Sequence, residues 1–225
     1  MSAILVRDDD RGRSAAIEAL RTGAIVALPT DTVYGLAVGL DTPGGIERLF
    51  HVKHRPPEKG IVLLLDDAAQ AALLGDMSLA AEALAAALWP GGLTIVVRRR
   101  TDVGLPDALT GGAATIGLRV PDHDAPRALA RSLGPLPVTS ANVSGAPEAR
   151  DAAEIQAILG DAIELILDGG PARGGPPSTV VDCSIDEPRI LRPGAIDAAR
   201  LAAALDAVGI RHAFRDDPGL SSRPA

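Results

Sequence analysis

The chain has 225 residues, enough to bury a sizeable core in one large domain or two small ones. Hydrophobic residues make up 47% of it and aromatic residues only 2%, so the core must be aliphatic. A net charge of −7 argues against a protein that coats nucleic acid, a single cysteine rules out an intramolecular disulfide, and no apolar run reaches the roughly 18 residues of a membrane span. Because the N-terminus also lacks an apolar signal core, we expect a soluble, cytoplasmic protein without membrane contact.

Helix and strand patterns alternate along the chain. Apolar spacing and capping signals predict helices at 14–23, 41–53, 66–74, 78–88, 124–133, 151–159 and 197–208. The first of these would have Ser14 as N-cap and Gly23 just past its end, and the second would be entered through Asp41 or Thr42. Short apolar runs predict strands at 24–29, 61–65, 93–99, 115–120, 135–140, 163–167, 178–184 and 189–194. This mixture is typical of an α/β protein with helices layered around a twisted sheet. We expect one domain over residues 1–212 and a flexible tail over 213–225.

Residues that are rare in this chain fall in three short polar stretches. The only tyrosine lies in LPTDTVYGL, both lysines lie in KHRPPEK, and the only asparagine lies in TSANVSG. Each stretch follows an apolar strand or helix, and loops at strand ends are where α/β proteins tend to bind ligands. Chance placement is the alternative for any one stretch. The common behaviour of all three favours a shared site.

The stretch KHRPPEKG concentrates positive charge. Lys53, Arg55 and Lys59 crowd around two prolines, which stiffen the connection and keep it out of a helix. A guanidinium grips phosphate or carboxylate oxygens in a fork, and lysine adds a mobile point charge. The pattern indicates a site for a polyphosphate or carboxylate. The alternative is a solvated surface charge run in which Glu58 pairs locally.

The other two stretches offer hydroxyls and amides. PTDTVYGL carries Thr30, Asp31 and Thr32 just beyond a predicted strand, and TSANVSG carries Ser140 and Asn142 behind another. Such groups suit recognition of a nucleobase, a ribose or phosphate oxygens. The alternatives are an ordinary capped turn for the first stretch and an Asx- or Ser-type turn for the second.

A charged residue also interrupts the predicted strand TIGLRV. Thr115, Gly117 and Arg119 lie on the same side of it, at a period of two residues. Arg119 stands between two apolar neighbours, and a buried arginine needs an anionic partner.

Several common motifs are missing. The chain has no GxxxxGK[ST] phosphate loop, no GxGxxG between a strand and a helix, and no GxSxG elbow. Its four histidines and Cys183 show no recognised metal-ligand spacing, so we expect no metal site built from protein ligands alone. A nucleotide, if bound, must occupy an unusual site.

The motifs PTDTVYGL, KHRPPEKG, SANVSG, STVVD and LRPGA occur in the order seen in the TsaC/YrdC family of threonylcarbamoyl-AMP synthases. The chain resembles this family from about residue 14 to about 208, and the pair KxRP…KG and SxN is specific where any single motif is weak. The resemblance implies a YrdC-like twisted mixed sheet with flanking helices and a basic concave face. Longer family members carry a further C-terminal domain, so this chain looks like the single-domain form.

The resemblance also implies an activity. It would be a nucleotidyltransferase that condenses L-threonine, bicarbonate or CO2, and ATP to threonylcarbamoyl-AMP and pyrophosphate, with Mg²⁺ accompanying the ATP. A partner transferase machinery would then move the threonylcarbamoyl group to an adenosine of tRNA. Carried over position by position, the residues implied to bind ATP are Lys53, Arg55, Lys59, Thr115, Ser140, Asn142 and Arg192. Those implied to bind threonine are Thr32, Arg119, Ser140 and Ser178, with the register of Ser178 against Thr179 open. Lys53 and Arg55 are the residues implied to act in catalysis.

Three other interpretations stay open from the sequence. Proteins similar to this fold are also linked with binding of double-stranded RNA, and a basic concavity would suit a phosphate backbone. A carbamoyl-adenylate-handling enzyme uses a similar domain in a much longer chain, but its zinc-finger and acylphosphatase-like segments are absent here. The last interpretation is a paralogue that keeps the fold and has lost the activity.

Overall fold

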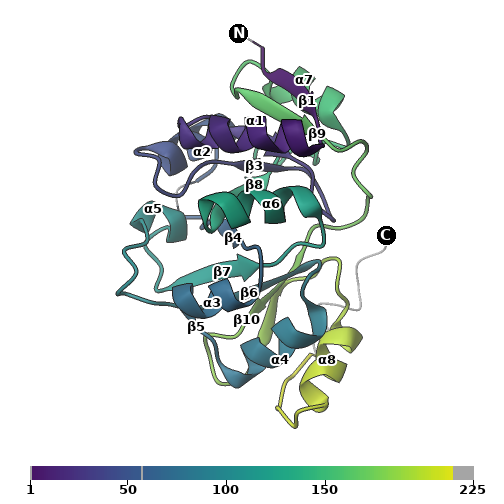
Figure 1. Ribbon diagram of the computed structural model, residues 1–225. Coiled ribbons are helices and arrows are strands. Elements are labelled where there is room, and N and C mark those ends of the chain that lie inside the picture. Colours follow the sequence, from purple (N-terminus) through teal and green to yellow (C-terminus); the bar gives the residue numbers. More distant parts are fainter. Residues whose placement is uncertain (1, 57, 215–225) are drawn as a thin grey trace.

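The computed structural model describes residues 2–56 and 58–214, and Figure 1 shows their course. Its strands are β1 (Ile4–Arg7), β2 (Val26–Leu28), β3 (Gly35–Ala37), β4 (Val62–Leu64), β5 (Gly75–Asp76), β6 (Leu93–Arg99), β7 (Thr115–Arg119), β8 (Leu136–Ser140), β9 (Leu165–Asp168), β10 (Thr179–Asp182) and β11 (Arg189–Arg192). They form one sheet in the order β1-β9-β2-β3-β8-β4-β7-β6-β10-β11, with β5 paired to β6. Strands β1, β9 and β2 run parallel, whereas β3, β8 and β4 pair antiparallel. The predicted mixed sheet is confirmed.

Helices cover this sheet. They are α1 (Asp10–Arg21), α2 (Gly45–Lys53), α3 (Ala69–Leu74), α4 (Leu79–Leu88), α5 (Asp107–Thr110), α6 (Asp124–Leu133), α7 (Ala152–Leu159) and α8 (Ala198–Asp206). Helices α1 and α6 lie side by side over one face, and α4 packs beside α8 at the far end of the molecule (Figure 1). Among the described residues, none of the helices combines the length and the apolar composition that crossing a membrane requires.

The core divides between the two faces of the sheet because side chains alternate along each strand. In β2, Val26 and Leu28 pack into the smaller cluster under α1 and α6, whereas Ala27 belongs to the larger cluster. The larger cluster also takes in side chains of α2, α4, α7 and α8. As the composition requires, both clusters consist mainly of aliphatic residues.

The predicted elements are all present, most of them with shifted ends. The strand at 93–99 and the helix at 124–133 have the predicted bounds. The elements that the patterns missed are β1, β3, β5 and α5, which have between two and four residues each. Such short segments show no measurable periodicity in the sequence, because a repeat needs several residues to appear.

Two predicted helix starts are wrong. The first helix begins at Asp10, because the carboxylate of Asp9 accepts a hydrogen bond from the Gly12 amide at 2.9 Å and caps it. Ser14 lies inside that helix and donates to the Asp10 carbonyl instead. The second helix begins at Gly45 rather than near 41–42, because Pro43 disfavours helical backbone in the residue before it and Gly44 takes a left-handed φ of 67°.

The C-terminal boundary also differs from the prediction. Phe214 is buried in the larger core cluster and stacks on His212, with ring centroids 4.9 Å apart. The packed chain therefore continues to Phe214, past the predicted end at residue 212. The remainder of the predicted tail, 215–225, lies outside the described residues.

Candidate active site

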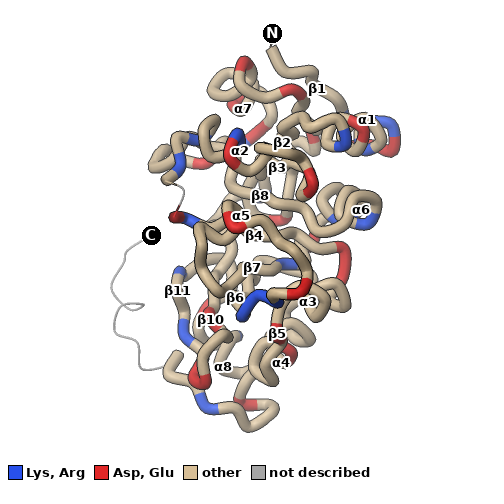
Figure 2. The backbone as a smooth tube through the Cα atoms, turned by 90° about the vertical axis from the view of Figure 1, so that its left-hand side faces the viewer, with Lys and Arg blue, Asp and Glu red and all other residues tan. Residues whose placement is uncertain are grey.

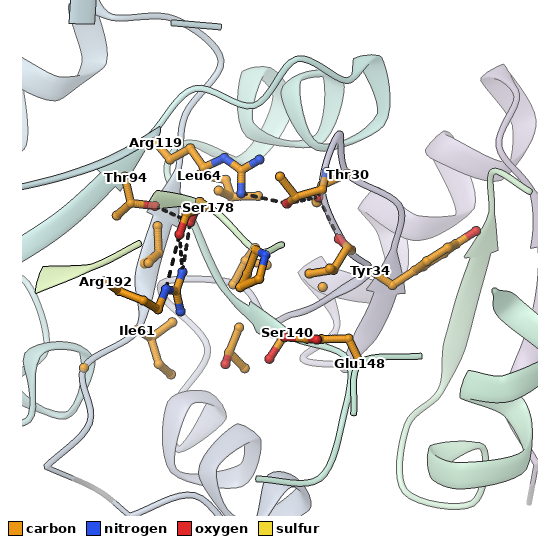
Figure 3. A pocket seen from close by; sticks show the side chains of 18 of the residues that line it. Thr30, Tyr34, Ile61, Leu64, Thr94, Arg119, Ser140, Glu148, Ser178 and Arg192 are labelled. Atoms are coloured by element: carbon orange, nitrogen blue, oxygen red, sulfur yellow. Dashed lines mark hydrogen bonds between the residues drawn. The ribbon is translucent and has the colours of Figure 1, made fainter. Parts of the chain in front are cut away.

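An open pocket lies where the central strands end (Figure 3). Its cavity volume is about 130 Å³, and the pocket is open to solvent on one side. The walls come from the turn between β2 and β3, from β4, β6, β7, β8 and β11, and from the segment before β10. Arg55, Arg119 and Arg192 line it together with several hydroxyl groups. This is the basic concave face that the resemblance implies, and its charge suits an anionic ligand.

Arg119 forms one wall at the end of β7. Its side chain is buried and donates to the Gly91 carbonyl at 3.0 Å, to Thr32 Oγ1 at 3.1 Å and to Asp31 Oδ1 at 2.7 Å. The carboxylate of Asp31 is the anionic partner that a buried arginine requires. These contacts use three of the five N–H groups of the guanidinium, which leaves two for a ligand.

The turn between β2 and β3 holds Thr32 against this arginine. Thr30 Oγ1 donates to the Val33 carbonyl at 2.6 Å and accepts from the Thr32 amide at 3.2 Å, so the turn is closed by its own side chain. Gly35, at the start of β3, lies against β8: a Cβ at this position would be 2.5 Å from Val138 Cγ1. Glycine is therefore needed here for β3 to pair with β8, which places Ser140 beside the turn.

A second polar network also lines the pocket. The Ser178 and Thr94 hydroxyl oxygens are 2.9 Å apart, and Arg192 donates to the Ser178 carbonyl at 2.7 Å and to Ser178 Oγ at 3.1 Å (Figure 3). The neighbouring Thr179 points the other way, because its hydroxyl donates to the Ile196 carbonyl at 2.6 Å. Of these two residues, Ser178 lines the pocket.

Arg55 holds the loop that follows α2. Its guanidinium donates to the Lys59 carbonyl at 3.0 Å and to the Gly60 carbonyl at 2.8 Å. Burial and the neighbouring charge of Arg192 both lower the pKa of Arg55, and burial lowers the pKa of Arg192. Both guanidiniums stay charged, since arginine is not deprotonated in proteins. Their mutual repulsion means that an anion between them would be stabilised.

Lys53 lies behind the pocket wall, at the end of α2. Its buried ammonium donates to the Ser140 carbonyl, to the Asn142 carbonyl at 2.6 Å and to Asn142 Oδ1 at 3.0 Å, while its own carbonyl accepts from the Ser144 amide at 3.0 Å. Ser140 Oγ also donates to Asn142 Oδ1, at 2.6 Å. The lysine thus fastens the loop after β8 through both its side chain and its backbone.

Comparison with known proteins places this arrangement in a family. Residues 18–194 match Sua5_yciO_yrdC, which is described as "Telomere recombination". The chain belongs to this family. The threonylcarbamoyl-AMP synthase of Bacillus subtilis (strain 168) is 34% identical over 218 residues, which cover 96% of this chain and 60% of that protein. A putative threonylcarbamoyl-AMP synthase of Mycobacterium tuberculosis (strain H37Rv) is 35% identical over 196 residues, covering 87% of this chain and 89% of that protein.

A solved family structure has the same fold. The crystal structure of Pyrococcus abyssi Sua5 complexed with L-threonine superimposes with a TM-score of 0.83 at 31% identity, covering 94% of this chain and 62% of that chain. This Sua5/YciO/YrdC domain therefore spans about three fifths of the length of the B. subtilis and P. abyssi proteins.

The structure of this Sua5/YciO/YrdC protein brings together six of the ten predicted site residues. The residues that line the pocket are Thr32, Arg55, Arg119, Ser140, Ser178 and Arg192. Four predicted ATP contacts lie outside the lining. Lys53 and Asn142 form the network behind it. Lys59 is exposed, and its backbone carbonyl accepts from Arg55. Thr115 begins β7 at the end away from Arg119.

Other pocket residues were not singled out by the sequence. Thr94 could have been noticed in the sequence, because it is a polar residue inside an apolar strand. Glu148 could not, because it follows the polar stretch TSANVSG and belongs to no recognisable motif. Conversely, the side chain of the only tyrosine, Tyr34, points away from the pocket (Figure 3). Its hydroxyl donates to the Gly170 carbonyl at 2.6 Å and accepts from the Gly169 amide at 3.1 Å, so it anchors the loop after β9.

Lys53 gives the protein a testable pH dependence. Burial lowers its pKa from 10.5 to about 8, assisted by the charge of Arg55 and opposed by that of Glu148. Between these two values the unfolded chain binds one proton more at this site than the folded chain, so this group makes the protein more stable as pH rises. Relative to Lys53→Met, the wild type should gain up to about 1.4 kcal/mol of unfolding free energy per pH unit in this window.

Denaturant unfolding of both proteins across this pH range measures the difference. Burial raises the pKa of Cys183 and of Tyr34 to about 12 each, which makes stability fall with rising pH, but both groups are shared by the two proteins and cancel. A difference in unfolding free energy that stays constant with pH would contradict the lowered pKa of Lys53.

Proposed function

We propose that this protein is an L-threonylcarbamoyladenylate synthase, a nucleotidyltransferase that condenses L-threonine, bicarbonate or CO2, and ATP to threonylcarbamoyl-AMP and pyrophosphate. The observation that carries the proposal is the convergence of Arg55, Arg119 and Arg192 with Thr32 and Ser178 on one pocket. It is supported by family membership and by relatives named threonylcarbamoyl-AMP synthase. The structure of P. abyssi Sua5 complexed with L-threonine supports the same substrate here.

The two ends of the pocket suit the two substrates differently. At one end, the two remaining N–H groups of Arg119 and the hydroxyl of Thr32 would hold the threonine carboxylate and orient the amine. Toward the other, Arg55 and Arg192 would hold the triphosphate, whose charge offsets their mutual repulsion. The carbamate of threonine and the triphosphate of ATP are both anionic and repel each other, so the guanidiniums are needed to bring them together.

The chemistry needs no side-chain nucleophile. The threonine amine forms a bond to the carbon of CO2 and loses a proton, which gives a carbamate. A carbamate oxygen then attacks the α-phosphorus of ATP, and the bond to the leaving pyrophosphate breaks. Catalysis in such a step comes from positioning and from stabilising the charge that develops on phosphate oxygens.

The pocket also fits a magnesium ion that arrives with ATP. Among the described residues no group of three or more histidine, cysteine or acidic side chains could hold a metal by itself. Mg²⁺ commonly uses one or two protein carboxylates together with substrate phosphates, and the lining contains the carboxylate of Glu148. When bound, the ion would neutralise charge on the phosphates.

A small anionic ligand fits the charge distribution better than a nucleic-acid backbone. In the view of Figure 2, basic and acidic positions are both scattered over the described part of the chain. Binding of double-stranded RNA relies on a wider track of phosphate contacts. We place tRNA downstream: the product would pass to a cytoplasmic transferase machinery that modifies it.

Incubating the protein with ATP, L-threonine and labelled bicarbonate tests this function. We expect labelled threonylcarbamoyl-AMP and an equal amount of pyrophosphate, and both should vanish when threonine is left out. Replacing threonine by serine should reduce kcat/KM by about 10- to 100-fold, because one buried methyl group contributes about 1–3 kcal/mol of discrimination. A folded protein that binds ATP and yields neither product would refute the synthase.

A further inference from the structure

Glu148 is an unexplained feature of the pocket. It lies on the loop after β8, is half-buried, and is the only carboxylate among the described residues that line the cavity. Within the described part of the chain its side chain makes no hydrogen bond or ion pair, although three arginines line the same pocket. An unpaired carboxylate in a cationic pocket points to a ligand that is itself positively charged.

The position of Glu148 separates it from the end that would bind the amino acid. Figure 3 shows Glu148 beside Ser140 on one side of the pocket and Arg119 with the Thr30 turn on the opposite side. A threonine held by Arg119 would therefore keep its ammonium close to that arginine. The charge of Glu148 instead reaches Arg192 and the buried Lys53, and it raises the pKa of each against the effect of burial.

Electrostatics limits what Glu148 can face. If the triphosphate lies along Arg55 and Arg192, a bare carboxylate on the same lining repels it, by about 1 kcal/mol at 4 Å in water and by more in a partly buried site. A divalent cation between the two reverses the sign of this interaction. Mg²⁺ prefers such a combination of carboxylate and phosphate oxygens and keeps water on its remaining positions.

On this basis we propose that Glu148 contacts the magnesium ion of the bound nucleotide, directly or through one ligand water, and so makes the pocket select Mg²⁺·ATP over metal-free ATP. The inference rests on the proposed use of ATP. It assigns to Glu148 the discrimination between the two forms of the nucleotide, whereas the arginines attract both forms.

Calorimetric titration of ATP into the protein tests this selection, once with Mg²⁺ and once with a chelator, in the absence of threonine. The wild type should bind Mg²⁺·ATP at least about tenfold more tightly than metal-free ATP. In Glu148→Gln the two affinities should converge: the affinity for Mg²⁺·ATP falls because a ligand is lost, and the affinity for metal-free ATP rises because a like charge is removed. Mn²⁺ in place of Mg²⁺ gives a second readout, a change in the electron paramagnetic resonance spectrum of Mn²⁺·ATP on binding that differs between wild type and variant.

Glu58→Gln is the matched control. Glu58 is an exposed carboxylate on the loop between Arg55 and Gly60 and does not line the pocket, so the same change in charge there should leave the preference for Mg²⁺·ATP intact. The proposal is overturned if Glu148→Gln keeps the wild-type preference, if it weakens both forms equally, or if it raises only the KM for threonine. If the wild type forms threonylcarbamoyl-AMP in any of these cases, the synthase function stands and only the role of Glu148 fails. A wild type that binds no ATP in either form overturns both.

Discussion

Replacing Arg119 by alanine should both destabilise the protein and abolish its use of threonine. The substitution leaves the buried carboxylate of Asp31 without its partner, and breaking a buried ion pair costs about 3–5 kcal/mol of unfolding free energy. It also removes the guanidinium that we propose binds the threonine carboxylate, so kcat/KM for threonine should fall by about 100- to 1,000-fold. Denaturant unfolding and pyrophosphate release measure the two effects.

Two further variants separate folding from substrate binding. Arg119→Lys keeps a charge near Asp31 but cannot reach Gly91, Thr32 and Asp31 at once, so stability should recover in part while the KM for threonine stays high. Arg131→Ala removes an exposed partner of Asp66, and neither residue lines the pocket, so this variant should cost less than about 1 kcal/mol. A lysine variant with a wild-type KM for threonine would show that Arg119 serves the fold alone.

The Arg119–Asp31 pair also shows what sequence patterns can and cannot predict. Placing Arg119 on an apolar strand indicated that it needs an anion, and the structure confirms this. The partner lies 88 positions away and meets it only because β7 and the turn after β2 end near one another. No local pattern contains that pairing, since it depends on strand order across the sheet.

The lysine motif illustrates a different limit. The sequence showed that Lys53 and Asn142 are unusual choices, and family resemblance implied that both face ATP. The structure joins them directly through Asn142 Oδ1 and buries the lysine behind the pocket lining. Residue rarity therefore pointed to this region of the fold, but it could not show which side chains line the pocket and which pack behind them. Lys53 donates to the carbonyl of Ser140, which does line the pocket.

Arg192→Ala should produce the largest loss of adenylation without loss of the fold. Arg192 ends β11, an edge strand whose residues are mostly exposed, so the variant should unfold within about 1 kcal/mol of the wild type. The affinity for Mg²⁺·ATP should fall, because one of the two guanidiniums proposed for the triphosphate is gone. The rate of pyrophosphate release should fall further, by about 100- to 1,000-fold in kcat/KM for ATP, if the same group also stabilises the charge that develops on the leaving pyrophosphate.

Arg189→Ala is the control on the same strand. Arg189 is mostly exposed, faces Asp182 at 3.5 Å and does not line the pocket, so its removal makes the same change in net charge and should leave both ATP constants unchanged. The split between KM and kcat then decides what Arg192 does. A rise in KM for ATP with unchanged kcat means that it binds the triphosphate equally in ground and transition states, whereas a fall in kcat assigns it to the adenylation step. Equal losses in both arginine variants would mean that only the overall charge matters, contrary to the contact that Arg192 makes with Ser178 inside the pocket.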